Sequence, residues 1–87
     1  MTLQPEAKVN AEARLLEGDV QFERQRFEEA GKAYAGVALL YDDPAITPRA
    51  LDKAADAYRR AGKTEEADRV AKQLRDRYPN YVPLAKS

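Results

Sequence analysis

The sequence predicts an all-α fold built from two antiparallel helix-turn-helix repeats, with four helices in all. The strongest indication is an internal repeat, because a shift of 37 residues places Asp19 on Asp56 and residues 28–30 on the identical residues 65–67. Apolar residues also recur every three or four positions, which is the spacing of one helix face. A repeat of this length in a helical pattern is typical of stacked hairpins that bury their apolar faces on one another.

The first repeat is predicted to span residues 11–44, with residues 1–10 as an N-terminal extension of its first helix. Pro5 and Glu6 mark the start, since proline suits the first helical position and acids suit the first turn. The helix should continue to about Arg24, with an apolar stripe at Ala11, Leu15, Gly18 and Phe22. A second helix is predicted over residues 27–41, with a stripe at Phe27, Ala30, Tyr34, Val37, Ala38 and Tyr41.

The clearest loop lies between the two repeats, with residues 45–47 separating them. Pro44 disfavours the helical conformation in the residue before it, so we expect the chain to leave the second helix by Asp43. Thr47 followed by Pro48 fits an N-cap and a first helical residue.

The second repeat is predicted over residues 48–81 and is followed by a tail at residues 82–87. Its first helix should end at Ala61 and Gly62, because glycine suits the left-handed position after a helix. Thr64 begins a segment that resembles a capping box one residue tighter than the usual spacing. The last helix should stop before Pro79.

Composition excludes several classes of function. The 87 residues include no cysteine and no histidine, which removes thiolate chemistry and the side chain best suited to proton transfer near neutral pH. Adjacent acids on a helix point apart, and the loop acids Asp42 and Asp43 lack the ligand spacing of a calcium loop. We therefore expect no catalytic residues, no metal site and no cofactor. The equal numbers of basic and acidic residues, 15 each, also argue against nucleic-acid binding.

The second repeat resembles a tetratricopeptide repeat, a helix–turn–helix motif with small residues at the helix crossing and a closing proline. The residues that carry the resemblance are Leu51, Ala54, Ala55, Tyr58, Gly62, Ala67, Ala71, Leu74 and Pro79. The first repeat is divergent, since Arg14, Glu17 and Gln21 stand where the motif has large apolar residues. Such residues suit a terminal repeat whose outer face meets water. The ending at residues 74–81 is similar to that of tetratricopeptide modules in bacterial envelope assembly proteins.

This resemblance implies a non-enzymatic module that binds a protein or peptide in a groove lined by the first helix of each repeat. The groove candidates are Glu12, Leu15, Asp19, Phe22 and Glu23 from the first repeat, and Arg49, Asp52, Asp56, Arg59 and Arg60 from the second. Phe22 would be an aromatic anchor in a groove of mixed charge. The same residues also fit ordinary solvated helix faces. A self-assembly unit without a groove ligand and an RNA-binding helical repeat remain open as alternatives.

The last helix is predicted to expose an apolar face, because repeat arrays need polar caps and the short tail cannot cover that helix. We expect a homodimer through this face, at Val70, Leu74, Tyr78, Tyr81 and Leu84. Charge would set its orientation, since residues 1–48 hold nine acids and five bases, whereas residues 49–78 hold nine bases and six acids.

No apolar run approaches the roughly 18 residues that indicate a membrane-spanning helix. The first residues lack the basic and apolar stretches of a secretory signal. A cytoplasmic location is therefore expected of the sequence as it stands, and a periplasmic one if it is excised from an envelope protein.

Overall fold

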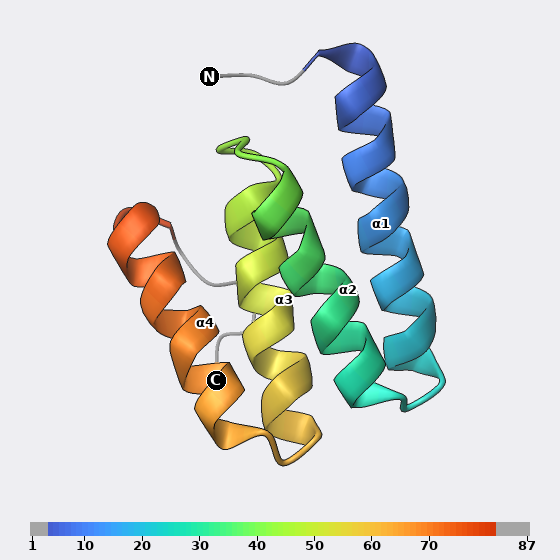
Figure 1. The fold of residues 1–87 in the computed structure, drawn as a ribbon, viewed down its shortest axis with the longest axis vertical. Helices are drawn as coiled ribbons and strands as arrows, with labels where there is room; N and C mark the ends of the chain where they lie inside the picture. Colours follow the sequence, from blue (N-terminus) through green and yellow to red (C-terminus); the bar gives the residue numbers. More distant parts are fainter. Residues whose placement is uncertain (1–3, 82–87) are drawn as a thin grey trace.

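The computed structural model describes residues 4–81, which form four α-helices. These are α1 (Pro5–Glu23), α2 (Phe27–Leu40), α3 (Thr47–Arg60) and α4 (Thr64–Arg77). Each helix packs against the next one in sequence and runs in the opposite direction, so two helical hairpins lie side by side (Figure 1). The all-α prediction is confirmed.

The two hairpin turns have the same backbone construction. After α3, Gly62 adopts a left-handed φ of 78°, and the Lys63 N–H donates to the Tyr58 carbonyl at 2.8 Å. These are features of a Schellman motif, which satisfies the last carbonyls of a helix. Gln25 occupies the equivalent position after α1 with a φ of 63°. The first turn therefore forms without a glycine, although a side chain in this region carries a steric cost.

Neither threonine acts as the predicted cap. α3 begins at Thr47 and α4 at Thr64, and the residues that precede them make no side-chain cap hydrogen bond. The buried Thr47 hydroxyl instead accepts a hydrogen bond from the Asp43 N–H and donates one to the Tyr41 carbonyl, both at 2.9 Å. Thr47 thus closes the loop between the hairpins rather than the first turn of α3.

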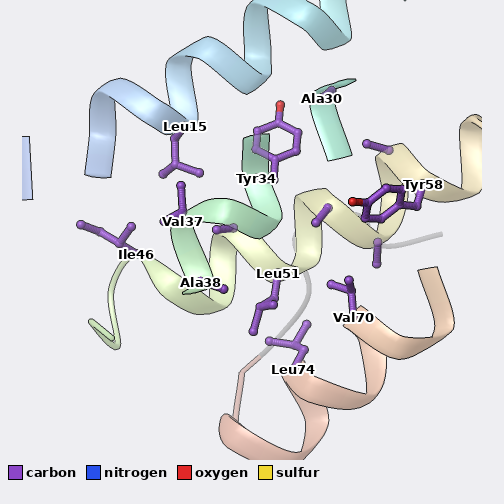
Figure 2. Close-up of a cluster of buried hydrophobic side chains, with 14 of the residues drawn as sticks. Leu15, Ala30, Tyr34, Val37, Ala38, Ile46, Leu51, Tyr58, Val70 and Leu74 are labelled. Atoms are coloured by element: carbon purple, nitrogen blue, oxygen red, sulfur yellow. The ribbon is translucent and has the colours of Figure 1, made fainter. Parts of the chain in front are cut away.

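Glycines allow the closest approaches between helices. A Cβ atom at Gly18 of α1 would lie 2.5 Å from a ring carbon of Tyr34, and one at Gly31 of α2 would lie 2.8 Å from the ring of Tyr58. Both rings are buried in the core that runs between the helices (Figure 2). The contact between Gly31 and Tyr58 joins the two hairpins, so their stacking depends on a missing side chain in α2.

The predicted apolar face of α4 is not exposed. Val70 and Leu74 are only 7% and 8% exposed, because α4 packs them into the same core as Leu51 of α3 (Figure 2). The hydroxyl of the half-buried Tyr78 donates to Asp42 in the loop between the hairpins. The expectation that α4 offers Val70 and Leu74 to a second copy is therefore wrong. Leu84, another predicted interface residue, lies outside the described residues.

The outer side of α4 is charged. Gly31 and Ala38 of α2 lie on the side that receives Tyr58 of α3. The equivalent positions on α4, 37 residues later, are Asp68 and Arg75, and both are exposed. Charged residues thus stand where a further hairpin would need small ones. The prediction that the second repeat lacks a cap is wrong, because its stacking face is polar.

Candidate functional site

A pocket of about 420 Å³ opens where α1, α2 and α3 meet. It draws on both hairpins, and its lining residues are Asp19, Phe22 and Glu23 of α1, Tyr34 of α2, and Lys53 and Asp56 of α3. Because α1 and α3 belong to different hairpins, the pocket exists only when the hairpins are stacked.

Asp19 is the best-fixed charge in this pocket. The Tyr34 hydroxyl donates to its Oδ1, and the Lys53 Nζ lies 3.0 Å from the same oxygen. The Lys53 Nζ also lies 5.6 Å from the centroid of the Tyr34 ring, within the range of a cation–π contact. Burial and, after it, the hydrogen bond to Asp19 raise the pKa of Tyr34, so its hydroxyl stays protonated and continues to donate. These contacts tie α1, α2 and α3 together.

An aromatic and cationic cluster lies around the lining residue Phe22, at the edge of the pocket. The Phe22 and Phe27 rings meet edge to face, with centroids 5.1 Å apart and an angle of 76° between their planes. The Arg60 guanidinium lies 5.1 Å from the Phe22 centroid, and its Nε lies 3.4 Å from the Asp56 Oδ1. The predicted aromatic anchor, Phe22, is therefore half-buried, and its ring already makes a cation–π contact with Arg60.

The lining of the pocket carries a net negative charge. Three carboxylates, on Asp19, Glu23 and Asp56, face one ammonium group on Lys53. Lys53 pairs with Asp19, and no ion pair joins the exposed Glu23 to another residue of the described part of the chain. Asp56 pairs with Arg60 at the edge of the pocket, so a cationic group that enters would meet Glu23 first.

The structure brings together four of the predicted groove residues and places Arg60 at their edge. The four that line the pocket are Asp19, Phe22, Glu23 and Asp56. Leu15 is a core residue with 3% exposure. Glu12 lies on a different side of α1, beside Val9 and Leu16.

The remaining groove candidates lie on α3, outside the pocket lining. Asp52 accepts a hydrogen bond of 3.3 Å from the hydroxyl of Tyr81, which was predicted as an interface residue. Arg49 is half-buried and Arg59 is exposed. These residues stay predictions as contacts of a partner.

Sequence reasoning did not select two lining residues, Tyr34 and Lys53. The position of Tyr34 on the apolar stripe predicts a core residue. Its hydroxyl is the group that bonds to Asp19 in the pocket. Lys53 lies three positions before Asp56, a spacing that puts two side chains on neighbouring parts of a helix surface. The spacing could have indicated that Lys53 lies near Asp56. It does not indicate the contact with Asp19, which is 34 residues away in the chain.

Among residues 4–81, no three histidine, cysteine or carboxylate side chains are grouped so that they could hold a metal ion. None of the helices there combines the length and the apolar character needed to cross a membrane.

Two stacked helical hairpins with a pocket across their junction define a helical-repeat fold. Residues 49–81, which contain nearly all of α3, all of α4 and the turn that follows, match the sequence model of the family described as Tetratricopeptide repeat. This segment is a tetratricopeptide-type repeat, as its sequence predicts, and repeats of this family serve in general as protein-interaction modules. No curated protein and no solved structure matches the chain. The similarity of residues 74–81 to bacterial envelope proteins stays a prediction.

Proposed function

We propose that this protein is an interaction module that binds a partner segment across the pocket between its hairpins. In this proposal, an arginine or lysine side chain of the partner enters between Glu23 and Asp56. The observation that carries the proposal is the excess of carboxylates in a pocket built from both hairpins.

Physical chemistry favours a cation over an anion at this position. Asp19 is already paired with Lys53 and Asp56 with Arg60, so Glu23 provides the charge that a partner would meet first, and Asp56 would be shared with Arg60. Hydrogen bonds between ionised partners contribute more than neutral ones. Because Glu23 is exposed, salt should weaken the attraction.

A pair of short extended peptides tests the proposal directly. One peptide carries a single central arginine, and the other carries citrulline, which has nearly the same shape but no charge. Fluorescence anisotropy should give at least about tenfold tighter binding for the arginine peptide, the factor expected from one charge-assisted hydrogen bond. The double variant Glu23→Gln with Asp56→Asn should abolish the difference, and circular dichroism should show unchanged helicity.

A matched control removes the same two charges elsewhere. Glu65→Gln with Asp68→Asn changes two exposed acids of α4, which contributes no residue to the pocket lining. This control should bind the arginine peptide as the parent protein does. Equal binding of the two peptides, or an equal loss in the control variant, would contradict the proposed site.

A further inference from the structure

α1 exposes an apolar stripe on the side that faces away from α2. Val9, Leu16 and Val20 are 67%, 64% and 48% exposed, and Ala13 lies between them. The spacings between these residues are four, three and four positions, which is the spacing of a coiled-coil seam. The opposite face of the same helix, at Ala11, Leu15 and Gly18, is buried.

The stripe is hollow enough to receive side chains. A shallow depression of about 550 Å³ lies along its N-terminal part. The depression is lined by Pro5, Lys8, Val9, Glu12, Ala13 and Leu16. In Figure 1, α1 lies at one edge of the bundle, with α2 on one side and no other described helix on the far side.

The borders of the stripe are mainly acidic. With a step of about 100° per residue, Glu6 and Glu17 flank it on one side, and Glu12 and Glu23 flank it on the other. Lys8 lines the depression near its N-terminal end, so these borders hold four carboxylates and one ammonium group. A helix that packs on the stripe would therefore place its flanking side chains against glutamates.

This charge pattern disfavours a second copy of the chain. In antiparallel pairing of two α1 helices each border of the stripe lies against the same border of the other copy, so the side that carries Glu12 and Glu23 meets the glutamates of the matching side. Like charges in such positions are destabilising. Stacking α1 of one copy on α4 of another would set the stripe against Asp68 and charged neighbours, since the described part of α4 exposes no large apolar side chain.

We propose that this stripe docks an amphipathic helix of another protein, with apolar residues at heptad spacing and lysine or arginine on both flanks. The apolar residues of that helix cover Val9, Leu16 and Val20, and its basic residues pair with the bordering glutamates. This surface is separate from the pocket between the hairpins, although Glu23 borders both.

Two synthetic helical peptides test this inference on the intact protein. Both carry leucine at the heptad a and d positions, and they differ only in having lysine or glutamate at the e and g positions. Fluorescence anisotropy should show binding of the lysine peptide and at least about tenfold weaker binding of the glutamate peptide. Glu12→Lys with Glu17→Lys should reverse this preference.

Matched variants locate the binding surface. Leu16→Ser should weaken binding of the lysine peptide at least about tenfold, whereas Leu39→Ser, which changes a still more exposed leucine of α2, should leave its affinity unchanged. Asp56→Asn, which alters only the pocket, should also leave it unchanged, so failure of one site does not imply failure of the other. Equal binding of the two peptides, or equal losses in the Leu16 and Leu39 variants, would overturn the inference. A dimer that dissociates on Leu16→Ser would also overturn it, because a second copy would then be the occupant.

Discussion

Two glycines of α2 provide a matched test of how the hairpins are stacked. Gly31→Ala and Gly36→Ala make the same chemical change within one helix. A Cβ atom at Gly31 would lie 2.8 Å from two ring carbons of Tyr58 and 3.0 Å from a third, whereas a Cβ atom at Gly36 would meet no atom within 4 Å. The comparison therefore isolates the cost of filling the junction between α2 and α3.

The expected magnitudes follow from two opposing effects. Alanine is favoured over glycine inside a helix by about 0.5–1 kcal/mol, and this gain applies to both variants. Overpacking of a well-filled contact costs about 1–3 kcal/mol and applies only at Gly31. We therefore expect Gly36→Ala to stabilise the protein and Gly31→Ala to be less stable than Gly36→Ala by about 1–3 kcal/mol.

Urea unfolding followed by far-ultraviolet circular dichroism measures this difference. The free energy of unfolding should fall with urea concentration at a similar slope in the two variants, since the surface exposed on unfolding is nearly the same. Their urea midpoints should be well separated. Equal stability of Gly31→Ala and Gly36→Ala would refute the close packing of Tyr58 on α2 and, with it, the relative placement of the hairpins.

Gln25→Gly is expected to stabilise the fold by about 0.5–1 kcal/mol, because glycine adopts a φ near 63° without steric cost. Thr47→Val is expected to destabilise it by about 1–3 kcal/mol, because the buried Asp43 N–H loses its acceptor. Urea midpoints measure both changes. Tyr34→Phe should reduce the loss of stability above pH 10. Folding raises the Tyr34 pKa above its ordinary value of 10.0, so the unfolded chain gives up this proton first and stability falls as the pH rises.

Each of these three predictions has a control. The control for Gln25→Gly is Gly62→Gln at the equivalent turn, which should destabilise the protein. An increase in stability on Gly62→Gln would contradict the shared turn geometry. Thr64→Val changes the exposed first residue of α4 and should alter stability by less than about 0.5 kcal/mol. A cost equal to that of Thr47→Val would remove the hydrogen-bond explanation. An unchanged alkaline profile in Tyr34→Phe would contradict the role given to burial and Asp19.

The sequence predicted the helices well because their signals are local. Pro5 marks the start of α1, and Gly62 adopts the left-handed conformation expected of it after α3. Gln25 adopts the same conformation after α1 although it carries no breaking signal of its own, so the sequence did not predict this turn geometry. Side-chain caps were predicted less well, because the hydroxyl of Thr47 could serve either its helix or the preceding loop.

The site was predicted only in part because it depends on distant contacts. The four groove residues that do line the pocket lie on helix faces that the repeat pattern identifies. By contrast, the pairing of Lys53 with Asp19 joins residues 34 positions apart, and no local pattern encodes it. The apolar residues of α4 were assigned to the wrong environment for the same reason, because Val70 and Leu74, predicted to face a second copy, are buried in the core.

The central claim is that a basic side chain of a partner enters the pocket between the hairpins. Nuclear magnetic resonance of the nitrogen-15-labelled protein tests it most directly, with the arginine peptide added and the citrulline peptide as reference. We expect the largest amide shift changes at residues 19–23 and 53–56, which surround Glu23 and Asp56, and much smaller changes with citrulline. Shift changes confined to residues 9–16 or to α4, or identical for the two peptides, would contradict the claim.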